Sequence, residues 1–115
     1  MISQTIDATG SFNALGKYNI DLSGWDYAVV NIITPGGTVN FNGTNDANAK
    51  TGISDGSAWS AINWQPEALT NVATGTSVVS TAATGNFKLN VGARFLQLVS
   101  SSTASKVIIY LTRIT

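Results

Sequence analysis

The sequence contains neither cysteine nor histidine, and these two absences remove much of the usual chemistry of active sites and metal sites. Without cysteine the chain has no disulfide, no thiolate nucleophile and no thiolate metal ligand. Without histidine it lacks the usual general base and the commonest transition-metal ligand. Asp21 and Asp26 flank a Ser-Gly-Trp segment, but acidic residues in a loop are the ordinary arrangement, and no Gly-rich phosphate loop leads from a strand into a helix. We therefore expect a protein that is not an enzyme and needs no cofactor.

Charge is also scarce. Charged residues are 10% of the chain, against roughly 25% in typical soluble domains. The six basic and six acidic residues cancel, and no basic cluster could form a nucleic-acid-binding face. No stretch approaches the ~20 apolar residues of a membrane span. The opening MISQTIDATG has neither a basic start nor an apolar run of signal-peptide length, so we expect synthesis in the cytoplasm without a classical export signal.

Neutral polar residues take the place of charge. Thr, Ser and Asn make up about a third of the chain. Because proteins in free solution normally use net charge to stay apart, such a surface favours a protein that packs beside others in an assembled particle.

Helical periodicity is absent, whereas short runs that alternate between apolar and polar residues recur along the chain. About eight strands at 8–12-residue spacing predict an all-β fold, a single antiparallel β-sandwich of jelly-roll-like form. The predicted strands are 2–7, 18–22, 28–34, 38–43, 59–64, 87–91, 94–100 and 106–115. The segment 28–34 is apolar on both faces except at Asn31, which predicts a central strand covered on both sides.

The predicted domain organisation is an extended N-terminal arm, 1–16, followed by a β-sandwich domain, 17–115. Ile2 and Ile6 give the arm strand character, but Gly10 and Asn13 interrupt any long strand. Such a segment has little apolar area of its own to bury, so we expect it to add a strand to a neighbouring subunit.

A polar stretch between Thr38 and Trp59 contains four residues that could form a loop site, Asn45, Asp46, Asn48 and Asp55. The favoured interpretation is a strand, a turn and a surface excursion, in which Asn and Asp side chains cap nearby backbone N–H groups. Two alternatives stay open. Oxygen ligands suit calcium, although the spacing does not match an EF-hand loop and no glutamate ends it. Asn and Asp beside an aromatic ring also suit a sugar.

Two tryptophans, Trp59 and Trp64, are five positions apart and would face opposite sides of one unbroken strand. One of them is then expected in the core. The other is either exposed, as at a sugar site, or covered by a partner protein.

The order of several motifs resembles a known family. A strand ending in FNGTND (41–46), a tryptophan at 59, TGNFKLNV (84–91), GARFLQLV (92–99) and a final KVIIYL (106–111) are similar to small β-sandwiches of tailed-phage virion proteins. Those modules are discoidin-like, galactose-binding-like jelly rolls of tail, fibre and capsid-associated proteins. The resemblance covers about 28–115, and the long insertion between Asp46 and Trp59 departs from it.

This resemblance implies a phage virion structural protein, located in the virion after synthesis in the host cytoplasm. Within that class we expect a capsid decoration or cement protein that binds the major capsid protein or other virion proteins. The expected assembly is a homo-oligomer, for example a trimer, with Trp59, Trp64, Ile2 and Ile6 as candidate interface or ligand residues. The alternatives are a carbohydrate-binding host-attachment module and a tail or baseplate component.

Overall fold

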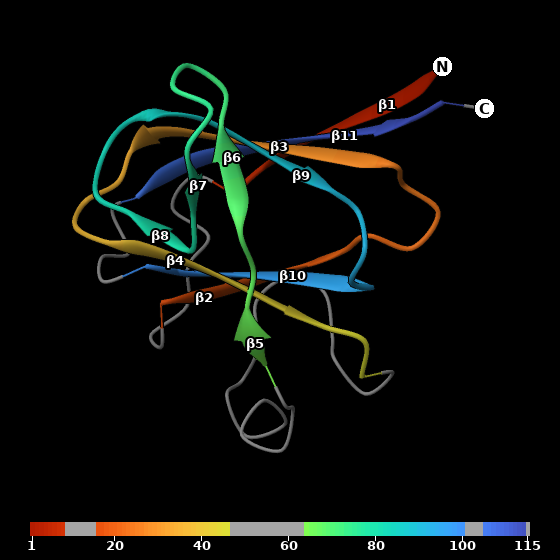
Figure 1. Cartoon of the computed structure of the whole chain (residues 1–115), viewed down its shortest axis with the longest axis horizontal. Helices are drawn as coiled ribbons and strands as arrows, with labels where there is room; N and C mark the ends of the chain where they lie inside the picture. Colours follow the sequence, from red (N-terminus) through yellow and green to blue (C-terminus); the bar gives the residue numbers. More distant parts are fainter. Residues whose placement is uncertain (9–15, 47–63, 101–104, 115) are drawn as a thin grey trace.

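The computed structural model describes residues 1–8, 16–46, 64–100 and 105–114, and these form two antiparallel β-sheets packed against each other (Figure 1). The all-β sandwich predicted from the sequence is confirmed. In chain order the strands are β1 (Ile2–Asp7), β2 (Lys17–Asp21), β3 (Tyr27–Thr34), β4 (Val39–Thr44), β5 (Gln65–Pro66), β6 (Leu69–Asn71), β7 (Ser77–Val78), β8 (Ser80–Thr81), β9 (Gly85–Asn90), β10 (Phe95–Ser100) and β11 (Lys106–Arg113). None of the described segments is a helix with the length and apolarity that a membrane crossing requires.

The strand order joins distant parts of the chain. One sheet has the order β1-β11-β3-β9-β6-β7, so the first and last strands are neighbours. The other has the order β2-β10-β4-β5, with β8 also paired to β4. Figure 1 shows the two layers, with β1, β11, β3 and β9 in one and β2, β10 and β4 in the other. As a result, β1 and β2 are edge strands of different sheets.

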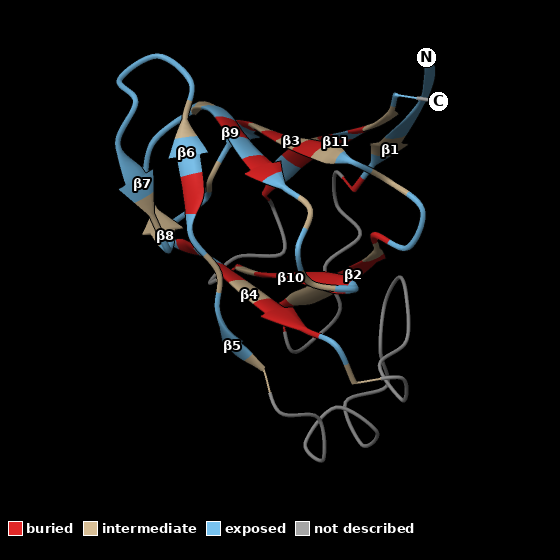
Figure 2. Cartoon of the chain, turned by 45° about the vertical axis from the view of Figure 1, so that its right-hand side comes forward, coloured by how far each residue is buried: buried red, intermediate tan, exposed pale blue. Residues whose placement is uncertain are grey.

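The facing sides of the two sheets form one apolar core (Figure 2). Alternation places Ala28, Val30 and Ile32 of β3 inward, all at most 1% exposed. Because side chains on a strand alternate between its faces, the residues between them point away from the core. Phe41 on β4 and Phe87 on β9 meet across the layers, with ring centroids 5.7 Å apart.

The structure corrects the prediction that the segment 28–34 is covered on both faces. β3 is central, between β11 and β9, but only its inner face packs against the second sheet. On its outer face Val29 is half-buried, and Ile33 is 46% exposed near the end of the strand. The physical reason is that a sandwich has two layers, so the outer face of each sheet lacks the helical layer that covers doubly buried strands.

β10 is an inner strand of the five-stranded sheet, between β2 and β4, and it carries a buried amide on the side opposite the core. Gln97 is 2% exposed and lies between Asn19 of β2 and Asn42 of β4 in the strand register. The Asn42 Nδ2 donates a hydrogen bond of 3.2 Å to the Gln97 Oε1. A row of amides therefore crosses three strands where the sequence shows only isolated polar residues.

The described part of the predicted arm belongs to the sandwich itself. β1 pairs along its whole length with β11 of the same chain, from Ile2 opposite Arg113 to Asp7 opposite Ile108. In the single chain this segment is therefore an edge strand rather than a separate arm. The reason is that β11 provides backbone hydrogen-bond partners along the whole of β1. A segment with little apolar area to bury depends on such hydrogen bonds to be ordered.

Candidate functional site

The loop residues singled out in the sequence are only partly within the described structure. Asn45 and Asp46 directly follow β4, whereas Asn48, Asp55 and Trp59 lie outside the described residues. Trp64 is half-buried just before β5, a two-residue edge strand that contains Pro66. In the described segments no group of three or more acidic side chains is placed to hold a metal ion. The calcium and sugar interpretations of this loop therefore remain predictions.

Asn45 has a structural role. Its Oδ1 accepts a hydrogen bond of 2.7 Å from the backbone N–H of Arg94, 49 positions along the chain. This contact ties the end of β4 to the turn that leads into β10. Next to it, the backbone N–H of Asp46 donates to the Thr44 Oγ1 at 3.2 Å. The sequence predicts that Asn45 caps backbone N–H groups of its own turn, whereas the bond in the structure is made to a residue far along the chain.

We expect Asn45→Ala to lower the free energy of unfolding by about 1 kcal/mol, the usual net value of one hydrogen bond. The freed Arg94 N–H is at an exposed site and can bind water, which limits the loss. Urea denaturation of wild type and variant measures it. Asn40→Ala, at an exposed position of β4, is the control and should stay within about 0.5 kcal/mol of wild type. Equal effects of the two changes would show that the Asn45 bond contributes nothing.

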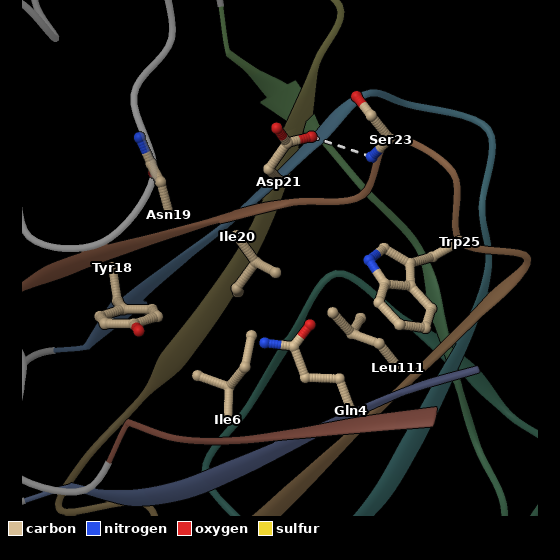
Figure 3. Close-up of a pocket in the computed structure, with 9 residues that line it drawn as sticks. All are labelled: Gln4, Ile6, Tyr18, Asn19, Ile20, Asp21, Ser23, Trp25 and Leu111. Atoms are coloured by element: carbon tan, nitrogen blue, oxygen red, sulfur yellow. Dashed lines mark hydrogen bonds between the residues drawn. The ribbon is translucent and has the colours of Figure 1, made fainter. Parts of the chain in front are cut away.

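An open cleft of about 430 Å³ lies where the edges of the two sheets face each other (Figure 3). Gln4 and Ile6 point into it from β1, and Tyr18 points toward them from β2. Trp25, in the turn after β2, closes one end. Its remaining lining residues are Asn19, Ile20, Asp21, Ser23 and Leu111. This volume falls in the range of small-molecule sites, about 300–1,000 Å³.

The cleft combines apolar walls with a few polar groups. The Tyr18 and Trp25 rings are half-buried, and the Gln4 amide lies between them. The Arg113 guanidinium lies 5.8 Å from the centre of the Trp25 ring. Such a site can stack a small ring and hydrogen-bond to its edge.

The two acidic residues considered for catalysis hold backbone in place. The Asp21 Oδ1 accepts a hydrogen bond of 2.9 Å from the backbone N–H of Ser23, and in Figure 3 its side chain points away from Gln4 and Ile6. The Asp26 Oδ2 accepts one of 2.7 Å from the backbone N–H of Ile114. Each carboxylate therefore has a structural partner of its own.

Burial raises the pKa of the Tyr18 phenol above its ordinary value. A raised pKa means that the native state keeps this proton at a pH where the unfolded chain releases it. The resulting contribution to stability is complete below the ordinary tyrosine pKa, about 10, and is lost as the pH rises above it. We expect the stability of wild type to fall more steeply than that of Tyr18→Phe between about pH 9 and 11. Parallel slopes in thermal melts would contradict this.

A second surface lies on the outer face of the six-stranded sheet. We call it the outer patch, and its members are Met1, Tyr27, Val29, Val72, Asn86, Lys88, Tyr110, Thr112 and Ile114. Val29 sits between Tyr110 and Lys88 in the register, and Val72 and Ile114 are 59% and 57% exposed. Lys88 is the one charged side chain in this set, and its Nζ lies 4.5 Å from the centre of the Tyr27 ring. The outer patch is thus an exposed, largely apolar surface.

Sequence reasoning identified neither surface. The alternation from Tyr18 to Leu22 was visible, but Gln4 and Trp25 come from other segments, and only the strand order brings them to one edge. The outer patch could not be identified either, because the sequence predicts that Val29 lies in a strand covered on both faces. The signal available for the outer patch was that 28–34 contains more apolar residues than one buried face of a strand needs.

The comparisons with known proteins show a structural neighbour. No family model matches the chain, and no curated protein shows a significant match. Among solved structures, the crystal structure of the SPBc2 prophage-derived protein YomS is similar, with a TM-score of 0.61 and 12% sequence identity over 96% of this chain and 92% of that chain. At this identity the comparison shows a shared fold. The resemblance to discoidin-like modules remains a prediction.

Proposed function

We propose that this chain is a non-enzymatic structural protein of a phage particle, and specifically a capsid decoration or cement protein. The observation that carries the proposal is the outer patch, a largely apolar surface on the six-stranded sheet. Exposed apolar side chains that gather on one face suit a site of interaction with another protein. The phage setting is supported by the fold shared with a prophage-derived protein over almost the full length of both chains.

The composition of the outer patch suits a contact between proteins. Tyrosine is enriched in interfaces, and here Tyr110 lies opposite Val29 in the register while Tyr27 is two residues before it on β3. The chain has a formal net charge of zero, so copies can crowd on a particle without mutual repulsion. The partner that this role implies is the major capsid protein, with the outer patch against the lattice.

Mass spectrometry of purified particles tests the proposal. We expect this chain in a copy number that is a fixed ratio to the major capsid protein, because a decoration protein occupies equivalent lattice positions. Absence from purified particles would overturn the proposal.

The contact surface is tested by adding purified protein to particles that lack it. Tyr110→Lys should bind particles more weakly, since Tyr110 is 41% exposed in the outer patch. Val79→Lys is the matched control, because Val79 is similarly exposed, at 47%, but lies outside the patch. Equal binding by the two variants would place the contact on another surface.

A second candidate function is carbohydrate binding for host attachment, and the cleft between β1 and β2 favours it. Tyr18 and Trp25 with the Gln4 amide form the aromatic and polar combination that sugars require. A glycan array in the presence of calcium tests it, with Trp25→Ala expected to abolish any signal. No signal from wild type would remove this candidate. A tail or baseplate location would keep the structural class and change only the partner.

A further inference from the structure

The strand β1 presents an open edge. It pairs with β11 on one side, and among the described strands nothing pairs with its other side. Its residues are exposed except Ile6, which is half-buried. An edge of this kind carries a row of unpaired backbone donors and acceptors, which are the complement of another extended strand.

The register identifies which backbone groups of β1 point away from β11. The backbone N–H of Ala8 donates to the carbonyl of Val107 at 2.9 Å, and Ala8 is opposite Val107 when the β1–β11 register is continued. In an antiparallel pair, hydrogen-bonded and non-hydrogen-bonded positions alternate. The even-numbered residues of β1 therefore bond to β11. The backbone N–H and C=O groups of Ser3 and Thr5 point outward, away from the sheet.

Natural edge strands usually carry features that prevent pairing with another chain, such as lysine, proline, a bulge or very short length. β1 has none of them: it is six residues long, contains no lysine or proline, and keeps an unbroken register with β11. β7, at the other edge of the same sheet, has only two residues. The open edge of this sheet is thus on the β1 side.

The sequence of β1 is chemically the same in both directions. Its first five residues are Ile-Ser-Gln-Thr-Ile, so antiparallel pairing of two copies sets Ile against Ile, a hydroxyl against a hydroxyl, and Gln against Gln. These five residues carry no charge, so two copies meet without like-charge repulsion. The free backbone groups require an extended strand, and this symmetry makes a second copy of the same strand its matching partner.

We propose that two copies of this chain associate through β1, in antiparallel register about a two-fold axis at Gln4. In this register Ile2 is opposite Ile6 of the second copy, and Ser3 is opposite its Thr5. Ser3 and Thr5 are the residues whose backbone groups point outward, so the hydrogen-bonded positions coincide. The self-complementary surface is the one that a two-fold symmetric dimer needs.

This pairing joins the two six-stranded sheets into one continuous sheet and leaves the outer patch of each copy free. It gives a dimer, in contrast to the trimer considered from the sequence. It is independent of the proposed function, because it concerns the contact between copies rather than the contact with the capsid.

A single engineered cysteine tests the register, since the chain has no native one. In the proposed pairing, Gln4 lies opposite Gln4 of the second copy at a non-hydrogen-bonded position. Cα atoms at such positions are about 4.5 Å apart, which is within the range that a disulfide spans. Gln4→Cys should therefore give a disulfide-linked dimer on mild oxidation of the folded protein. Thr5→Cys is the control: the two Thr5 residues are diagonal, beyond about 7 Å, and should cross-link poorly. Equal cross-linking of the two variants would overturn the register.

Thr5→Pro tests the contact itself. The Thr5 N–H points outward, so proline removes a donor to the second copy but none to β11, and edge positions of this kind tolerate proline. In sedimentation velocity we expect wild type and Thr5→Ala to be dimers and Thr5→Pro to be a folded monomer. A monomeric wild type, or a dimer that persists in Thr5→Pro, would overturn the proposal.

A charge pair keeps the test decisive if Thr5→Pro does not fold. In the proposed register, Ser3→Lys combined with Thr5→Lys sets lysine against lysine between copies and should abolish the dimer. Ser3→Lys combined with Thr5→Glu sets lysine against glutamate and should retain it. The same oligomeric state for both double variants would contradict this pairing.

Discussion

Replacing Phe41 by alanine is expected to lower the free energy of unfolding by about 3–5 kcal/mol, the range for removing a buried phenylalanine from a core. Phe41 is fully buried on β4 and meets Phe87 of β9, so its ring connects the two sheets at the centre of the sandwich. The loss combines two free energies: the hydrophobic stabilisation that the buried ring provided, and the cost of the cavity that remains. Thermal and urea denaturation measure it, and we expect the melting temperature to fall by more than about 10 °C.

Val72→Ala is the control for Phe41→Ala. Val72 is 59% exposed, so its truncation should change the free energy of unfolding by less than about 0.5 kcal/mol. A Phe41→Ala variant that loses less than about 1 kcal/mol would show that the two sheets do not pack through this ring.

Replacing Gly16 by alanine is expected to destabilise the fold by more than about 2 kcal/mol, because two costs add. Gly16 has a φ of 69°, a left-handed conformation that costs other residues about 1–2 kcal/mol. A Cβ at this position would also overlap the backbone carbonyl oxygen of Ser100. The backbone cannot move aside freely, because the Ser100 N–H donates a hydrogen bond of 2.7 Å to the Gly16 carbonyl.

Gly24→Ala separates these two costs. Gly24 has a similar φ of 82°, but a Cβ there would meet no atom within 4 Å. It should therefore lose only the conformational term, about 1–2 kcal/mol. The excess loss in Gly16→Ala measures the overlap with Ser100, and equal losses in urea denaturation would contradict it.

The strands of the sandwich could be predicted where one residue pattern decides them. Alternation and β-branched residues were enough for β1, β3, β9 and β11. The pairing of β1 with β11 could not be predicted, because strand order depends on contacts between the two ends of the chain. The region of β6, β7 and β8 was also indistinct, since strands of two or three residues carry too few positions to show a period.

The functional surfaces were less predictable than the strands. The capping by Asn45 follows from its place in a turn, but its partner, the Arg94 N–H, is 49 positions away and no local pattern indicates it. The cleft is built from β1, β2 and the turn at Trp25, so it exists only once the two sheets are stacked. The apolar residues on both faces of β3 predict a second covering layer, whereas in the structure the outer face of this strand forms part of the outer patch.

An electron-microscopic map of purified phage particles that contain this chain tests the central claim most directly. The proposal predicts density for a two-layer sandwich at equivalent positions on the outside of the capsid lattice, with the outer patch against the major capsid protein. Density for the sandwich only in the tail or baseplate, or no such density anywhere on the particle, would contradict the assignment as a capsid decoration protein.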